Sequence, residues 1–317
     1  MDNRALDALI CPVCGLEFME VLPGEMSLVC IDGHTFDIAR QGYVNLLTGH
    51  GTKFTQDTAA MVAARDEFLD AGHYRALADA LAGTVEHILA AARSGAASPA
   101  HRPLILDAGT GTGWYLQQLL ARRGDGGLLE TVAGADADAD ANAGAGAEPA
   151  VDAIGLDISK FALRRAARRN PLAASLVWDL WQPLPMEAHR ADVVLVVFAP
   201  RNAAEFARVL TPAGRLVVVT PRPGHLAEIA RQAGMLGIHP EKDAALAASL
   251  ASHFELESSQ PVTAALRLTV ADIANVALMG PAGHHLDPRE LDRTVAGLPK
   301  WTDVTAEFTI SVFRRLP

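Results

Sequence analysis

Cysteine is scarce in this chain: three occur in 317 residues, and all of them lie within the first 30. Three thiols at one end cannot form the disulfide framework that stabilises small secreted domains. No apolar run approaches the ~20 residues that span a bilayer, since the longest strongly apolar stretch is 193–199. The N-terminus also lacks an apolar segment followed by a small-residue cleavage site. These absences predict a cytoplasmic protein with no secretory signal and no membrane partner.

Positive charge is also in short supply. The formal net charge is −10, from 27 basic and 37 acidic residues, which at first argues against a nucleic-acid partner because phosphate binding depends on Lys and Arg. However, segment 124–153 holds seven acidic residues and no basic one, so the remaining chain is near −3 (27 minus 30). Within it, the Gly-, Ala- and Asp-rich stretch 124–150 predicts a disordered acidic insertion. Net charge therefore neither supports nor excludes RNA binding.

A histidine follows the three cysteines at a spacing typical of zinc ligands. Cys11 and Cys14 are separated by two residues, which places two thiolates on one tight turn, and Cys30 and His34 supply a second pair. Unrelated buried cysteines would not all fall beside a histidine in a window of 24 residues. About 45 residues hold too little apolar surface to fold unaided, so the metal would supply stability on the order of 10 kcal/mol. The sequence predicts one structural Zn²⁺ held by these four side chains.

Short apolar runs separated by helical patterns follow this N-terminal unit. Two amphipathic helices are expected first, one from Asp57 with Gly72 as its stop and one over 74–92. The apolar runs then lie at 104–106, 153–156, 175–177, 193–198 and 215–219. Their alternation with helices predicts a doubly wound, parallel α/β sheet, whereas the alternating pattern 304–312 predicts an antiparallel edge or hairpin strand. We therefore predict a zinc-binding unit at 1–48, a helical linker region at 49–103 and an α/β domain at 104–317.

A glycine-rich loop directly follows the first strand of that domain. Asp107, Gly109, Gly111 and Gly113 form the pattern D-x-G-x-G-x-G, in which bare backbone can approach a ligand at the start of a helix. A dinucleotide-binding loop requires its third glycine one residue later, where this chain has Trp114. The loop therefore predicts a cofactor other than a dinucleotide.

An acidic residue at the end of the second strand supports a cofactor site. Asp157 lies 48 residues after Gly109, and subtracting the 30-residue acidic segment leaves 18. About 20 residues separate the glycine loop of an uninterrupted βαβ unit from the carboxylate that binds ribose hydroxyls. The spacing assigns Asp157 to this role and supports the interpretation of 124–150 as an insertion.

The loop resembles motif I of the class I, Rossmann-like methyltransferases that use S-adenosylmethionine (SAM). Longer strings, which cover the chain apart from the insertion, resemble the RlmA-type 23S rRNA (guanine-N1)-methyltransferases. The resemblance is closest to the Gram-positive, TlrB-like branch, which includes the tylosin-resistance enzyme. These strings are GHTFDIARQGYVNLL at the zinc site, MVAAR, LDAGHY, VFAPRN, VVTP with HLAEIA, and MGP followed by His285.

The resemblance implies methylation of N1 of a guanine in a hairpin of 23S rRNA or of a large-subunit precursor, with SAM as cofactor. It implies that the zinc unit helps to bind RNA, and that a homodimer forms an RNA cleft; tylosin-type macrolide resistance is a possible consequence. It also implies that Tyr74 and His225 approach the cofactor alongside Gly113 and Trp114, and that Asp179 lies near the adenine amine. By pattern alone, Tyr74 simply begins a helix and Asp179 is a strand-end turn residue.

Substrate contacts are expected at the string FAPRN, 198–202, because open α/β sheets present residues to substrate at the carboxyl ends of their strands. Arg201 is predicted to meet a phosphate or a base. Asn202 begins the capping-box pattern NAAE, so its side chain can start a helix as well as contact substrate. His285 is the third candidate. Relatives have tryptophan at the position of His284, where imidazole is a weaker platform for stacking on guanine.

The catalytic base stays unassigned. Guanine N1 carries a proton at neutral pH, so a base must remove it, but the sequence singles out no residue for this role. Two other functions are open: a small-molecule or natural-product methyltransferase with a structural zinc site, and a non-catalytic RNA-binding scaffold. The intact Asp107, Gly109, Gly111 and Asp157 argue against the scaffold because they predict retained cofactor binding.

Overall fold

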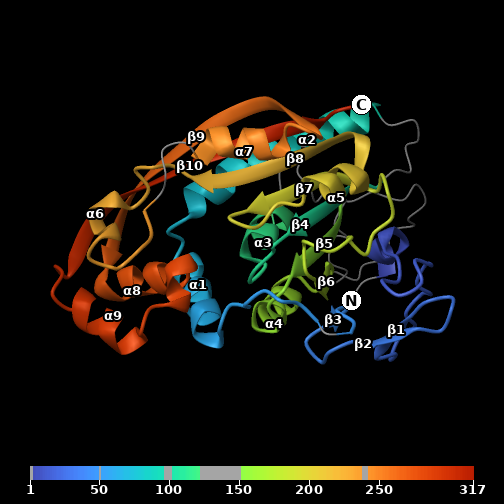
Figure 1. Ribbon diagram of the computed structural model, residues 1–317, viewed down its shortest axis with the longest axis horizontal. Helices are drawn as coiled ribbons and strands as arrows, with labels where there is room; N and C mark the ends of the chain where they lie inside the picture. The colour runs from blue at the N-terminus through green and yellow to red at the C-terminus, as the bar shows by residue number, and fades with distance from the viewer. Residues whose placement is uncertain (1–2, 50, 96–101, 122–150, 238–241) are drawn as a thin grey trace, which may run out of the picture.

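A mixed eight-stranded sheet forms the centre of the protein (Figure 1). The computed structural model describes residues 3–49, 51–95, 102–121, 151–237 and 242–317. In order across the sheet, the strands are β3 (Tyr43–Asn45), β6 (Ala174–Val177), β5 (Asp152–Asp157), β4 (Leu104–Ala108), β7 (Ala191–Val197), β8 (Leu210–Pro221), β10 (Trp301–Arg315) and β9 (Phe254–Thr269). Neighbours from β3 to β8 are parallel, which confirms the five predicted strands of the α/β domain.

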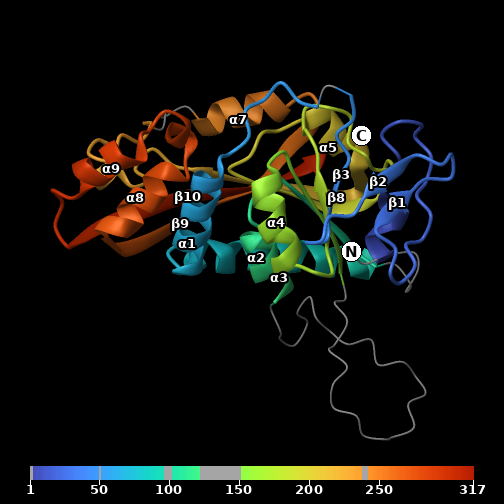
Figure 2. The same cartoon turned by 90° about the horizontal axis from the view of Figure 1, so that it is seen from below.

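Helices cover both faces of the sheet, with α2 and α3 on one side and α5 and α7 on the other (Figure 2). The helices are α1 (Ala59–Asp70), α2 (Arg75–Gly95), α3 (Trp114–Leu120), α4 (Lys160–Arg169), α5 (Ala203–Val209), α6 (Ala227–Ala230), α7 (Lys242–Leu250), α8 (Val270–Leu278) and α9 (Pro288–Val295), with short 3₁₀ helices η1 (Asn3–Ala8) and η2 (Pro281–His284). Alternate residues of one strand serve the two faces: Val193 and Leu195 join the core under α2 and α3, whereas Val194 and Val196 join the core under α5 and α7. The predicted doubly wound α/β architecture is confirmed.

The two helices predicted ahead of the sheet are confirmed as α1 and α2, and local sequence sets the ends of α1. The hydroxyl of Thr58 accepts a hydrogen bond from the Met61 amide at 3.2 Å and caps the start of the helix. Gly72, with φ of 84°, follows the end. Helix α1 then packs against α3, α4 and α8. It therefore joins segments that lie far apart in the sequence.

The zinc-binding segment packs on the sheet and also adds a strand to it. Strands β1 (Ser27–Val29) and β2 (Thr35–Asp37) form a separate antiparallel pair. Segment 35–47 contains β2 and then β3, which pairs in parallel with β6. Leu6 and Leu9 share a buried core with β4 and β5. The N-terminal segment and the α/β domain are thus held together by one hydrophobic core.

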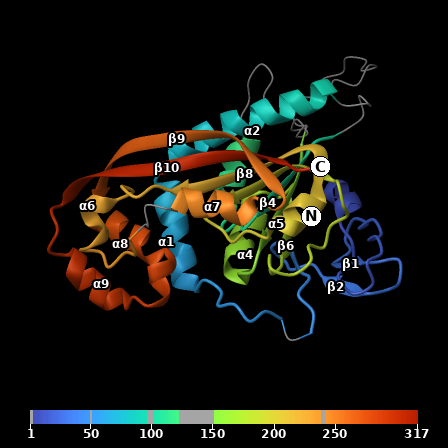
Figure 3. The same ribbon diagram turned by 45° about the horizontal axis from the view of Figure 1, so that its top comes forward.

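The C-terminal part forms a long antiparallel ribbon of β9 and β10 (Figure 3). Residues 301–307 of β10 pair with β9 beyond the reach of β8. Helices α8 and α9 connect the two strands and lie with α6 at one end of the molecule, opposite the zinc-binding segment (Figures 1 and 3). The predicted antiparallel strand is confirmed, but β10 lies between β8 and β9 instead of at the edge.

Two sequence predictions concern regions at the limits of the described structure. The acidic insertion 124–150 and residues 96–101 of the predicted helical linker region lie outside the described residues. Among the helices of the described ranges, none is both long and apolar enough to cross a bilayer.

Candidate functional site

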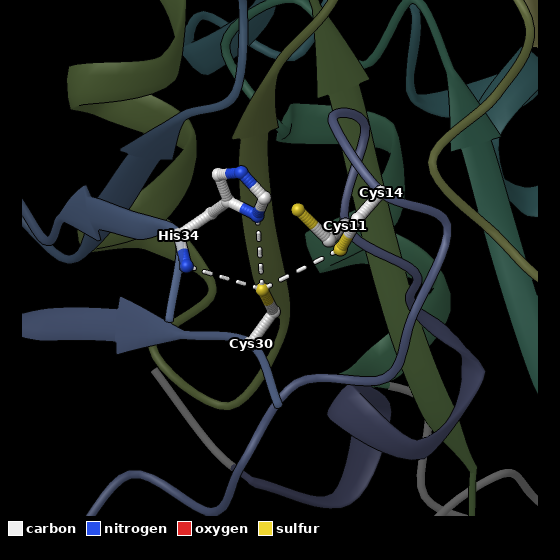
Figure 4. A group of neighbouring side chains, drawn as sticks. All are labelled: Cys11, Cys14, Cys30 and His34. Carbon is white, nitrogen blue, oxygen red and sulfur yellow. Dashed lines mark hydrogen bonds between the residues drawn. The ribbon is translucent and has the colours of Figure 1, made fainter. Parts of the chain in front are cut away.

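Three thiols and one imidazole converge in the N-terminal segment (Figure 4). The ligand atoms of Cys11, Cys14, Cys30 and His34 all lie within 4.8 Å of one another. The sulfur of Cys30 lies 3.7 Å from that of Cys14 and 3.5 Å from Nδ1 of His34. Tetrahedral ligands with bonds of about 2.3 Å to zinc are roughly 3.8 Å apart. The fold thus gathers the four predicted ligands at the spacing of one zinc ion.

Two glycine turns shape this cluster. Gly15 and Gly33 have φ of 75° and 84°, and their amides donate to the carbonyls of Cys11 and Cys30, each at 2.8 Å. The amide of His34 also donates to the sulfur of Cys30 at 3.3 Å. Desolvation raises the pKa of the Cys30 thiol, but hydrogen bonds from His34 and the neighbouring thiols outweigh it and lower the pKa to about 7. The pKa of Cys14 is instead raised to about 11: a backbone hydrogen bond at Leu16 lowers it, but burial and the hydrogen bonds with Cys30 and Cys11 outweigh this. Three sulfurs and one imidazole nitrogen are a donor set that fits a structural zinc ion.

The loop between β4 and α3 has the left-handed backbone that its glycines permit. Gly109, Gly111 and Gly113 have φ of 89°, 55° and 72°. The amide of Gly109 donates to the carbonyl of Leu156 at 2.8 Å, which fastens the loop to β5. A Cβ at Gly113 would lie 2.6 Å from Nδ2 of Asn170. The loop therefore depends on glycine both for its backbone angles and for its close approach to α4.

Two carboxylates stand beside this loop. Asp107 is buried and accepts from Oγ1 of Thr110 at 2.6 Å. Asp157 accepts from the amide of Gly111 at 2.9 Å through one oxygen and from that of Ser159 at 2.7 Å through the other. Desolvation raises the pKa of Asp107 to about 7, and the pKa of Asp157 is raised for the same reason. Each oxygen of Asp157 has a further lone pair that could accept from a ribose hydroxyl.

The residues of the loop and of the start of α3 offer groups that a ligand of mixed polarity could contact. Two buried side-chain oxygens, Oγ1 of Thr112 and Oη of Tyr115, have no hydrogen-bond partner within the described structure. A Cβ added at Gly111 would meet only the side chain of Arg65 within 4 Å, at 3.7 Å. Bare backbone beside unsatisfied hydroxyls is an arrangement that a bound ligand completes. These residues fit a SAM molecule.

Tyr74 and His225, which are 151 residues apart in the sequence, form a pair. Oη of Tyr74 lies 3.0 Å from Nε2 of His225, and Nδ1 of His225 accepts from the amide of Glu307 at 3.1 Å. A neutral His225 therefore carries its proton on Nε2 and donates it to Tyr74. Both rings pack against Phe308, at centroid distances of 4.9 Å and 4.7 Å. Trp114 lies buried at the start of α3.

Asp179 follows the carboxyl end of β6 and binds the segment that leads from the zinc cluster to α1. It accepts from the Trp181 amide at 3.0 Å, which confirms the predicted strand-end turn, and from Oγ1 of Thr52 at 2.8 Å. Thr52 lies just beyond β3 in the chain. No local pattern in the sequence marks Thr52 as a partner of Asp179. Contact of Asp179 with an adenine amine stays a prediction.

Comparisons with known proteins identify the family. The RlmA N-terminal zinc-ribbon model matches residues 9–50. The chain is 41% identical to the 23S rRNA (guanine(748)-N(1))-methyltransferase of Streptomyces fradiae, over 100% of both chains. It belongs to the 23S rRNA (guanine-N1)-methyltransferases. A candidate enzyme of this name from Micromonospora griseorubida is also 41% identical, over 99% of each chain. A Bacillus subtilis candidate is 32% identical over 69% of this chain and 66% of its own.

In this methyltransferase, helix α1 covers the glycine loop through residues that the sequence analysis missed. Arg65 pairs with Asp57 at 2.6 Å and donates to the carbonyl of Met279 at 2.8 Å. Nε2 of His284 lies 3.5 Å from the other oxygen of Asp57. The string MGPAGHH is thereby held against the start of α1. Arg65 is the last residue of the string MVAAR, and membership of that string was the one feature of the sequence that could have marked Arg65 as a site residue.

Asn202 is committed to structural hydrogen bonds. Its Oδ1 accepts from the amide of Glu205 at 3.4 Å, and its Nδ2 donates to the carbonyl of Leu180 at 3.0 Å. The predicted N-cap of α5 is confirmed. The carboxylate of Glu205 binds the amide of Leu184 at 2.6 Å and leaves the reciprocal half of the capping box unmade.

Arg201 and His285 are less constrained than Asn202. The guanidinium of Arg201 is half-buried, and no residue of the described structure pairs with it. Desolvation lowers the pKa of Arg201, but an arginine side chain stays protonated in proteins. His285 is exposed just after η2. Arg201 is therefore the substrate candidate with an uncompensated charge at the carboxyl end of β7.

Proposed function

We propose that this chain transfers the methyl group of SAM to N1 of a guanine in 23S rRNA. The observation that carries the proposal is the combination of a zinc cluster and an intact glycine loop in a chain that matches the S. fradiae enzyme over both full lengths. The name of that relative places its target at guanine 748, and we expect the corresponding guanine here. Because its substrate is ribosomal, we place the protein in the cytoplasm.

The protein's own residues would position both reactants. Bound SAM supplies an electrophilic methyl group. The glycine loop would hold it, with Asp157 accepting hydrogen bonds from ribose hydroxyls, while Arg65 of α1, paired with Asp57, lies over Gly111. A base-paired guanine must leave its helix and lose the N1 proton before or during attack. Holding both reactants in line supplies much of the rate acceleration.

Arg201 is the residue that we place against the guanine. A guanidinium presents two parallel N–H donors that match O6 and N7 of guanine. Binding at that edge leaves N1 free to face the methyl donor. When the N1 proton leaves, negative charge spreads to O6, where a cation stabilises it. The half-buried and unpaired state of Arg201 supports this role.

We predict that Arg201→Gln lowers kcat/KM for 23S rRNA about 10- to 100-fold, the value of one bidentate contact to a base, while SAM affinity is unchanged. Because glutamine does not stabilise the N1 anion, the pH–rate profile should also shift to higher pH. Methyl incorporation across a pH series measures both effects. Arg168→Gln, at an exposed arginine on α4, is the control. An unchanged pH profile together with an unchanged kcat/KM would remove Arg201 from the site.

Labelled SAM offered with 23S rRNA transcripts tests the proposed function, followed by primer extension on ribosomes from wild-type and deletion strains. We expect label in the RNA and a single reverse-transcription stop at the target guanine, since an N1 methyl group blocks base pairing. Label in crude metabolites alone would favour the small-molecule methyltransferase. Failure to bind SAM in calorimetry would favour the RNA-binding scaffold. Comparing the tylosin sensitivity of the two strains shows whether resistance follows.

We further propose that the zinc unit, residues 1–48, contributes to RNA recognition ahead of a helical region at 49–103 and a methyltransferase domain at 104–317. Residues 1–60 hold three basic and eight acidic side chains. Recognition by this segment would therefore depend on shape and a few placed contacts more than on a positive field. The homodimer implied by the family stays a prediction, which light scattering can test.

A further inference from the structure

One aromatic residue beside the glycine loop has an unusual backbone. Phe198 follows β7 with φ of 56°, one of three positive values among the described non-glycine residues. Bulky L residues rarely adopt this region because Cβ crowds the backbone carbonyl. The residue is also 45% exposed. Strained residues that the surrounding structure holds in place cluster at ligand-binding sites.

Buried groups support the Phe198 ring from behind. Its centroid lies 5.7 Å from that of Phe308 and 6.4 Å from that of Tyr115, and both of these rings are buried. The next residue, Ala199, touches the cofactor loop, because a Cβ added at Gly109 would lie 2.3 Å from the Ala199 Cβ. A fixed, partly exposed ring thus stands beside the loop, at the carboxyl end of a strand, where α/β sheets bind substrate.

We propose that the Phe198 ring is the surface on which the target guanine stacks. The inference rests on the proposed function. A guanine that leaves its RNA helix loses the stacking of its neighbours, and an aromatic side chain replaces it. Three residues further on, Arg201 can hold the O6/N7 edge while the ring holds the face of the base. His284, the other candidate platform, is drawn toward Asp57, with Nε2 3.5 Å from its carboxylate.

A purely structural role for Phe198 explains its geometry less well. A side chain that only filled the core would be buried, as Phe308 and Tyr115 are. It would also gain stability in an ordinary extended backbone. The observed ring is half-exposed on a strained backbone, so packing in the core does not by itself account for its position. A flat base is a ligand of the right shape.

Steady-state methylation of a 23S rRNA hairpin transcript tests the proposal. Phe198→Ala is expected to lower kcat/KM for the RNA about 10- to 100-fold, the usual cost of losing one base–aromatic stack. Phe198→Tyr should restore most of it, and SAM affinity measured by calorimetry should be unchanged in both. Phe161→Ala is the matched control, since Phe161 is 43% exposed on α4.

Phe198→Gly separates stacking from packing. Glycine adopts φ of 56° without strain, so the variant should melt no lower than Phe198→Ala and yet methylate as poorly. The proposal is overturned if the wild type methylates the RNA and either variant retains its kcat/KM, or if SAM binding falls in step with methylation. No methylation by the wild type would overturn the proposed function itself, and this inference with it.

Discussion

Replacing Cys14 by serine is expected to reduce 23S rRNA methylation to background while the protein still binds SAM. Serine is a poor zinc ligand, and structural zinc contributes on the order of 10 kcal/mol to the folding of such small units. The glycine loop follows β4 and Asp157 ends β5, and neither contributes a zinc ligand. Of the contacts described at the cofactor edge, the Thr52–Asp179 hydrogen bond depends on the N-terminal segment. A hydrogen bond to a charged group contributes about 1.5–3 kcal/mol to stability, so its loss should affect folding more than SAM affinity.

Three measurements on Cys14→Ser check this expectation: bound zinc by metal analysis, methyl incorporation into rRNA, and SAM affinity by calorimetry. Val13→Ser is the matched control, because Val13 lies in the same turn, is 52% exposed and is not a ligand. It should keep its zinc and its activity. If Cys14→Ser instead loses SAM binding and methylation to the same extent, the zinc only holds the fold together and has no separate part in RNA recognition.

The features that could be predicted from the sequence are those that short stretches of chain determine. The zinc ligands are defined by two local turns, and Gly15 and Gly33 occupy the left-handed positions of those turns. The glycine loop is similarly local, since the positive φ angles of Gly109, Gly111 and Gly113 require that residue type. The strands and helices could be predicted because each buries one or both of its faces, and this burial leaves a periodic pattern of apolar residues in the sequence.

The features that could not be predicted depend on segments brought together from far apart. The pairing of Tyr43 with Ser175, which makes β3 a strand of the main sheet, leaves no periodic signal in either segment. Arg65 reaches the carbonyl of Met279 across 214 residues of sequence. The positive φ of Phe198 is set by its surroundings and contradicts the preference of phenylalanine. Tertiary contacts determine the position of β3, the contact of Arg65 and the backbone of Phe198. The Arg65 contact also places α1 over the cofactor loop.

Gly111→Ala is expected to weaken SAM binding about 10- to 100-fold, because one added methyl group in a close-packed site costs roughly 1–3 kcal/mol. The new Cβ would meet only Arg65, at 3.7 Å, so it can be added on the Arg65 side of the loop without displacing the fold. The left-handed backbone at Gly111, with φ of 55°, adds a stability cost of about 1–2 kcal/mol. Calorimetry with SAM and thermal unfolding measure the two effects separately.

Two further glycines provide the controls for Gly111→Ala. Gly72 has φ of 84° and nothing within 4 Å of an added Cβ, so Gly72→Ala should show the backbone cost with normal SAM affinity. Gly113→Ala should instead lose stability most, because its Cβ would lie 2.9 Å from the Cα of Ala166 in α4. A Gly111→Ala protein that binds SAM as tightly as Gly72→Ala does would show that the cofactor does not approach the backbone at Gly111.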